Sequence, residues 1–146
     1  MGFEAMGLRH SDVVVNKVLS VNATVTVPED VTLDIGTLLS SSDGGVTFTT
    51  QTTAAYAAGS YDTGDEVYHL GHIFESLADA NTAVPGSDAT KWEDKGAWNA
   101  NGILCDYIET TGVANVLVSG VVVEQNLTGF EEALRSTLFE NKIILK

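Results

Sequence analysis

GILCDYI at Gly102–Ile108 and NVLVSGVVV at Asn115–Val123 are two nearly continuous apolar runs, and they decide the fold. Both are too short to cross a membrane as a helix, and the Thr- and Gly-containing segment Glu109–Ala114 separates them. The pattern predicts a central β-hairpin with at least one strand buried on both faces. Gly120 lies inside the second run, which indicates a bulge or a close backbone approach.

Composition narrows the function classes. The chain has 146 residues, which suits one domain, and its charged fraction of 18% leaves an apolar surface typical of a subunit in an assembly. Only Arg9 and Lys17 are basic before Lys91, and the net charge of −13 repels phosphate backbones. We therefore expect no nucleic-acid binding. No apolar run is long enough for a membrane span, and no secretory signal pattern begins the chain.

The first thirty residues contain two segments with strand chemistry. Val21–Val27 alternates strictly between apolar and polar residues, and Val13–Val15 is a second β-prone run. Pro28 then stops the pairing. We interpret residues 1–30 as an extended arm that adds a strand to a neighbouring sheet or, with equal weight, pairs within its own domain. The arm residues expected to bind a partner are Val13, Val14, Val15, Val21, Ala23, Val25 and Val27.

Residues 31–146 are predicted to form a single β-rich body. Val31–Leu39 and Val46–Thr50 have strand patterns on either side of a Ser- and Gly-rich turn, and Glu66–Phe74 is a further strand candidate. Ile143–Leu145 is predicted as a short final strand or docked tail. The section at about 50–95 is an atypical insertion, which ends in a polar connector, Lys91–Gly96.

A short helix is expected near the C-terminus. Thr128 and Glu131 have the three-residue spacing of a capping box, in which each side chain bonds to the other residue's backbone amide. The apolar positions that follow fall on one helical face. They are Phe130, Ala133, Leu134, Thr137 and Leu138.

Few residues carry a pattern of reactive chemistry. His69 and His72 would suit a metal only on a helix, and Gly71 argues against one, so a surface or inter-subunit pair is favoured. An acidic turn contains Asp62 and Asp65 but lacks the spacing of a calcium loop, and a solvated turn is favoured over a cation site. The single cysteine is expected to be a small buried hydrophobe. We therefore predict no catalytic residue, no metal site and no cofactor.

Trp92 and Trp98 precede the hairpin. Such aromatic side chains stack on sugars in some binding proteins, but beside a buried hairpin they more often belong to a core or an interface. We therefore assign both tryptophans to a possible interface with a partner.

Three motifs, in order, resemble the head decoration proteins of tailed bacteriophages, the lambda-type decoration protein D family. Leu33–Leu39 (LDIGTLL) resembles the family's opening "L-x-x-G-T-V-L", and Ala100–Leu104 (ANGIL) resembles its "A-x-G-I-L" strand. Val116–Val122 (VLVSGVV) resembles the "V-L-V-x-G-x-V" strand that follows. The tail, with its short helix and final strand, is similar as well. The match covers roughly Val31–Leu39 and Asn99–Lys146, whereas the insertion departs from the pattern.

The resemblance implies a small β-tulip domain with an extended N-terminal arm. It implies a homotrimer on the outer surface of a mature phage head, where it clamps the major capsid protein after synthesis in the host cytoplasm. In that family the N-terminal arm adds a strand to the capsid protein. Two alternatives stay open: a receptor- or glycan-binding β module of a viral fibre or surface protein, which would use Trp92 and Trp98, and an enzyme that would use His69 and His72.

Overall fold

The computed structural model describes residues 9–146, which divide into two compact units. Within the described residues, unit 1 consists of 9–51, 99–130 and 135–146, and unit 2 consists of 52–98 and 131–134. The chain is mainly β with one short C-terminal helix, as predicted, and its strands form two sheets. Neither sheet closes on itself in the part of the chain that is described.

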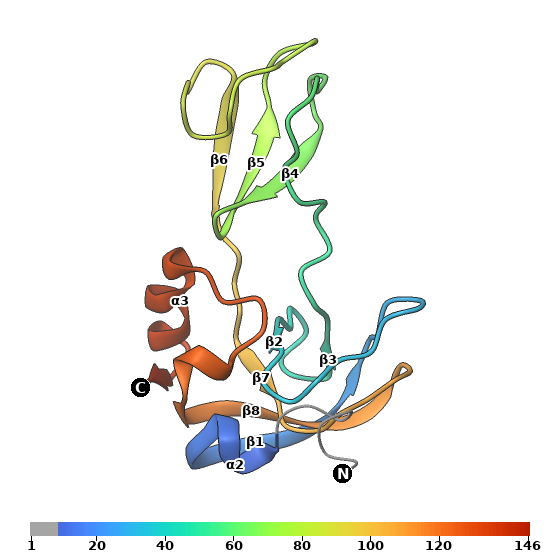
Figure 1. Ribbon diagram of the computed structural model, residues 1–146, viewed down its shortest axis with the longest axis vertical. Coiled ribbons are helices and arrows are strands. Elements are labelled where there is room, and N and C mark those ends of the chain that lie inside the picture. The colour runs from blue at the N-terminus through green and yellow to red at the C-terminus, as the bar shows by residue number, and fades with distance from the viewer. Residues whose placement is uncertain (1–8) are drawn as a thin grey trace. The chain divides into compact units, whose positions relative to one another are not determined.

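Unit 1 is built on a six-stranded sheet in the order β2-β7-β8-β1-β3, with β9 also paired to β8 (Figure 1). Its strands are β1 (Val14–Val25), β2 (Leu38–Leu39), β3 (Thr47–Phe48), β7 (Gly102–Leu104), β8 (Gly112–Val122) and β9 (Ile143–Leu145). Short helices flank it: α2 (His10–Val13), the 3-10 turn η1 (Glu124–Asn126) and α3 (Arg135–Glu140).

The predicted central hairpin is confirmed. β7 pairs antiparallel with β8 through Ile103–Leu117 and Leu104–Val116, and every residue of β7 is buried. β7 is nevertheless shorter than the apolar run Gly102–Ile108, because the chain turns away after Leu104 and Cys105 onwards lies outside the strand. The apolar character of that run reflects burial in the core as well as strand pairing.

The longest pairing joins β1 to β8, antiparallel from Val14–Val122 to Val25–Gly112 (Figure 1). The alternation predicted for Val21–Val27 is confirmed, because Ala23, Val25 and Val27 are buried while the threonines between them are exposed. The sequence left open whether this segment pairs with a partner's sheet or within its own domain. In the structure it pairs with β8 of the same unit. The division into an arm of residues 1–30 and a body stays a prediction, and residues 1–8 lie outside the described residues.

The rest of unit 1 packs against these strands. The expected strands Val31–Leu39 and Val46–Thr50 are reduced to β2 and β3, which are joined by a bridge between Ser40 and Thr49. Phe48, Leu104 and Val116 are fully buried in the core under the sheet. β2 and β3 have two residues each and form few backbone hydrogen bonds, so their positions depend on this side-chain packing.

The C-terminal helix differs from its predicted start. Thr128 lies in an extended bridge with Thr37, and a 3-10 turn, η2 (Glu132–Leu134), precedes α3. Backbone pairing thus takes the place of the expected capping box at Thr128. The final strand is confirmed: β9 pairs in parallel with β8, from Gly120–Ile143 to Val122–Leu145.

Unit 2 is a three-stranded antiparallel sheet, β4-β5-β6, made of β4 (Glu66–His69), β5 (His72–Ser76) and β6 (Trp92–Ala97). The expectation of one strand over Glu66–Phe74 is wrong, because Leu70 and Gly71 form a tight turn with φ of 50° and 89°. Two successive positive φ values match a type I′ hairpin turn. The polar connector expected at Lys91–Gly96 is instead the edge strand β6.

Candidate interaction surface

The first half of β1 is irregular on the side that pairs with β8. Val14 and Asn16 pair with the consecutive residues Val122 and Val121, so Val15 is an extra residue in β1. The shift from Lys17 to Leu19 leaves Val18 extra in the same way. Extra residues of this kind bend a strand and turn its side chains away from their regular positions.

The same stretch of β1 presents apolar side chains to solvent. Val15 is 50% exposed, Val18 is 70% exposed and Leu19 is 54% exposed. Beyond Thr24 and Val25, which pair with β3, no described strand bonds to the edge of β1 that faces away from β8. We call this edge of Val14–Ala23 the open edge of β1. A long apolar strand with an unpaired edge is a template for pairing with another chain.

Gly120 fixes how closely β1 and β8 approach each other. A Cβ atom at Gly120 would lie 2.3 Å from the carbonyl oxygen of Asn16, so any larger side chain would force the strands apart. The Gly120 amide donates to the carbonyl of Lys142 over 3.0 Å. Lys142 has a φ of 70°, a backbone conformation that glycine or asparagine usually adopts after a helix. It lies just beyond the last residue of α3, Glu140. These contacts confirm the close approach predicted for Gly120.

An apolar groove of about 300 Å³ opens between β1, β8, β9 and α3. Its exposed apolar side chains are Val18, Phe139 at 64% exposure and Ile144 at 39%. We call it the Val18 groove, and its lining residues are Val18, Ser119, Gly120, Val121, Phe139, Lys142 and Ile144. Phe139 is exposed on α3 while Leu138, its neighbour, is fully buried, so α3 has one face in the core and another toward solvent.

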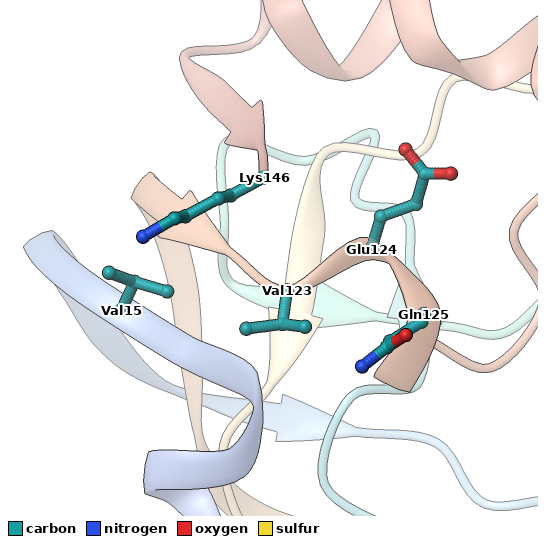
Figure 2. Close-up of a pocket in the computed structure, with 5 residues that line it drawn as sticks. All are labelled: Val15, Val123, Glu124, Gln125 and Lys146. Atoms are coloured by element: carbon teal, nitrogen blue, oxygen red, sulfur yellow. The ribbon is translucent and has the colours of Figure 1, made fainter.

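A second groove, of about 510 Å³, lies where β1, β9 and η1 meet. Figure 2 shows the Lys146 side chain extending toward Val15, with Val123 and Gln125 on the other side of the groove. The Glu124 carboxylate points away from Val15 (Figure 2), and Arg135 donates to it over 2.6 Å. This groove therefore combines two valine side chains with the polar side chains of Gln125 and Lys146.

The predicted arm residues divide into two groups. Most of them have buried side chains, and Val21 is half-buried, so these residues hold β1 in its own sheet. Only Val15 is exposed, and the structure adds Val18 and Leu19, which the sequence pattern did not single out. The buried members are Val13, Val14, Ala23, Val25 and Val27. No periodic signal could have found Val18, because its exposure results from the bulge.

The two tryptophans have different environments within unit 2. Trp92 is 3% exposed in a core with Val67 and Phe74, and its Nε1–H donates to the Ala83 carbonyl over 2.8 Å. Trp98 is half-buried and meets Tyr68 edge to face. A ring as deeply buried as that of Trp92 cannot stack on a ligand from solvent, whereas part of the Trp98 ring is accessible.

His69 and His72 face each other across the Leu70–Gly71 turn as direct strand partners. The hairpin turn between them brings both side chains to the same face of the sheet. They have separate partners: His72 Nδ1 lies 2.9 Å and 3.0 Å from the two carboxylate oxygens of Asp94, and His69 packs edge to face on Tyr56. The Asp94 carboxylate is an acceptor for the His72 ring.

The carboxylates in and near the acidic turn of unit 2 accept hydrogen bonds from backbone amides. The Asp62 amide donates to Asp65 over 2.8 Å, the Ala80 amide donates to Asp62, and the Thr63 amide donates to Asp79. Hydrogen bonding from Thr63 lowers the pKa of the Asp79 carboxyl. Among the described residues no group of three or more His, Cys, Asp or Glu side chains is arranged to hold a metal ion.

Cys105 is 4% exposed, which confirms that it is a buried residue. Burial raises the pKa of its thiol to about 11, with the Asp106 charge acting in the same direction and a backbone hydrogen bond from Leu117 opposing it. The thiolate is the reactive form of cysteine, so this thiol is inert at neutral pH.

Comparison with known protein families, with curated proteins and with solved structures finds no significant match to this chain. None of the described helices has both the length and the apolar character needed to cross a membrane.

Proposed function

We propose that this chain is a non-enzymatic decoration protein of a bacteriophage capsid. It binds the major capsid protein on the outer surface of the mature head as a homotrimer and stabilises that head. In this proposal the β-rich body has the tulip shape of the lambda-type decoration proteins, and the apolar surface of the chain is covered by neighbouring subunits. The three motifs that resemble that family support the proposal.

The observation that carries the proposal is the open edge of β1 with Val15, Val18 and Leu19 exposed along it. In a solitary soluble protein such an edge favours aggregation, so proteins commonly shield or interrupt it. In an assembly protein it serves as the site where a partner adds a strand, because backbone hydrogen bonds give affinity and alternate side chains give specificity. The partner strand in this proposal belongs to the capsid protein.

This arrangement changes the role first assigned to the N-terminal segment. β1 is paired to β8 over its whole length, so a partner strand can pair with it only along the open edge. The apolar contact with the capsid protein then comes from side chains beside that edge. Val15 and Leu19 are the two exposed ones that lie outside the Val18 groove.

The experiment mixes the purified chain with empty, expanded heads and measures the bound copies per head and the heat resistance of the heads. We expect saturable binding and a higher disruption temperature. Leu19→Glu places a charge beside the open edge and should reduce head binding by about tenfold or more, because a charge buried in an apolar contact is costly. Val46→Glu is the matched control: Val46 is 66% exposed in unit 1 but lies in a turn.

Equal loss of binding in the Leu19 and Val46 variants would show that added negative charge, rather than the open edge, is responsible. Absence of any saturable binding to heads would remove the capsid role altogether. The glycan-binding alternative has one partly exposed tryptophan, Trp98, and no further observation in its favour. Glycan arrays would test it independently of heads.

A further inference from the structure

The charges of unit 1 are separated along the chain. All of its basic residues lie in the segments 9–17 and 135–146, whereas the remaining parts, 18–51 and 99–130, contain acidic residues and no lysine or arginine. The basic residues are Arg9, Lys17, Arg135, Lys142 and Lys146. A net charge of −13 therefore conceals a local concentration of cations in unit 1.

Two of these cations have carboxylate partners nearby. Arg9 lies 3.3 Å from Asp12, and Arg135 lies 2.6 Å from Glu124. The lysines form no ion pair with any carboxylate of residues 9–146 and are exposed. They are Lys17, Lys142 and Lys146.

The unpaired lysines line the two grooves or adjoin a lining residue in the chain, and Lys146 lines the groove beside Val15. Lys142 lines the Val18 groove, Lys17 precedes Val18 in β1, and Lys17 pairs with Gly120 in the floor of the groove. Two carboxylates come from the neighbouring elements: Glu140 is exposed at the end of α3, and Glu124, which lines the second groove with Lys146, is paired with Arg135. The three lysines outnumber them. We call Lys17, Lys142, Lys146 and the Val18 groove together the basic end of unit 1.

The other end of the β1–β8 pair has the opposite character. Val25 pairs with Gly112, and the Val27 amide donates to the Thr111 hydroxyl over 2.9 Å, which holds the two neighbouring turns together. Exposed valines lie close in the chain to exposed carboxylates: Val31 follows Asp30 and is 43% exposed, and Val113, near the start of β8, is 74% exposed. We call Glu29, Asp30, Val31, Glu109 and Val113 the acidic end.

We infer that unit 1 associates head to tail with a second copy of this chain, the basic end of one copy binding the acidic end of the next. Opposite charges steer the encounter, and the Val18 groove buries exposed valines of the acidic end. The inference deepens the self-association part of the proposed function. A cyclic trimer requires each copy to present two different, complementary surfaces, because each contact in a ring is heterologous.

The β1–β8 pair fixes the spacing that such association needs. From Lys17 to Val25 the strand spans about 26 Å, at about 3.3 Å per residue. This separation exceeds the screening length of about 10 Å at 0.1 M salt, so the two ends of one copy do not neutralise each other. The charge of each end can therefore attract a neighbouring copy. The acidic end of a second copy has the opposite charge to the basic end of the first.

The experiment measures self-association of the purified full chain, without heads, by sedimentation velocity at low and high salt. The first variant, Lys17→Glu with Lys142→Glu, makes both ends acidic. The second, Glu29→Lys with Glu109→Lys, makes both ends basic and avoids Asp30, which has a positive φ of 60°. Each variant should self-associate at least about 100-fold more weakly than the parent chain, because like charges then meet.

Two further samples separate charge complementarity from net charge. An equimolar mixture of the two double variants should associate again, since one supplies acidic ends and the other basic ends. The quadruple variant restores opposite ends at the original net charge of −13 and should also associate. Lys91→Glu with Lys95→Glu in unit 2 is the matched control. It should leave association unchanged, although it alters the net charge as much as the first variant does.

Several outcomes would overturn the inference. A parent chain that stays monomeric at low salt would do so, and so would association that survives either charge reversal in a chain whose circular dichroism is native. Failure of the mixture to associate would show that the two ends do not meet. Because heads are absent, these results are independent of capsid binding, which the Leu19→Glu experiment tests.

Discussion

Gly120 lies so close to Asn16 that a Cβ atom on it would stand 2.3 Å from the Asn16 carbonyl oxygen. This contact joins β8 to the bulged half of β1, where the open edge and the Val18 groove are formed. Gly120→Ala should therefore destabilise the chain by about 1–3 kcal/mol, the usual cost of overpacking, because backbone atoms cannot move aside as a flexible side chain can. Urea unfolding followed by circular dichroism measures the change.

Gly112→Ala is the matched control in the same strand. A Cβ atom there would lie 3.9 Å from the Thr110 carbonyl oxygen, which is an ordinary contact. We expect its free energy of unfolding to stay within about 0.5 kcal/mol of the parent chain. Equal destabilisation by the two substitutions would mean that loss of glycine in β8, rather than the approach to Asn16, is responsible.

Cys105 should be unreactive in the folded chain. Because burial raises the pKa of its thiol to about 11, the thiolate fraction at neutral pH is very small and the sulfur is shielded from reagents. A disulfide reagent should label the thiol slowly in buffer and rapidly in denaturant. Fast labelling under native conditions would place Cys105 in an open environment and contradict its buried position.

Asp43 should make the stability of unit 1 depend on pH. Its carboxylate accepts the Thr47 amide over 2.9 Å and the Ser41 hydroxyl over 2.8 Å, and these bonds lower its pKa below the usual 3.8. A lowered folded-state pKa stabilises the chain above the unfolded-state value, and this contribution is lost as pH falls through the folded-state pKa. Asp43→Asn should thus be less stable at neutral pH.

Urea midpoints of the parent chain and Asp43→Asn, measured from neutral pH down to about pH 2, check this prediction. The difference between the two chains should shrink in acid, since protonation removes the charge from the parent chain as well. A difference that stays constant over the whole range would show that amide geometry, and not the carboxylate charge, is responsible.

Trp92 and Trp98 should differ in their contribution to unit 2. Trp92→Phe removes the indole donor to the half-buried Ala83 carbonyl and reduces the volume of a buried ring, at a cost of about 1–3 kcal/mol. Trp98→Phe keeps a ring beside Tyr68 at a half-buried position and should cost less than about 1 kcal/mol. Denaturant unfolding of both variants measures the two costs. The reverse order would contradict the assignment of Trp92 to the core.

The long strands were predictable from local pattern. Val21–Val27 alternates because one face of β1 is buried, and the apolar run at Asn115–Val123 reflects β8, a strand in the middle of a sheet. The run at Gly102–Ile108 reflects the short strand β7 and the buried Cys105 that follows it. The hairpin at Leu70–Gly71 was not predictable in the same way. Its turn lacks the Asn-Gly or Asp-Gly dipeptide that marks such turns, and only strand pairing on both sides holds Leu70 at a positive φ.

The candidate interaction surface was only partly predictable. Sequence reasoning found Val15, but it grouped Val15 with side chains that the fold buries, such as Val25. It did not find Phe139, because a helical pattern alone does not say which exposed position borders a groove formed by distant strands. β6 was missed because an exposed edge strand with charged residues has no apolar alternation.

The sequence by itself determined the β class of this protein, its central hairpin and the strand at Val21–Val27. Local residue chemistry is sufficient for these features, since the apolar and polar pattern along the chain follows the burial of strand faces. Only the tertiary structure decided that Val18 is exposed at a bulge and that Lys17 and Lys142 share one end of unit 1. The register between β1, β8 and β9 sets these positions, and this register depends on pairs of residues that are distant in the chain, such as Lys17 and Gly120.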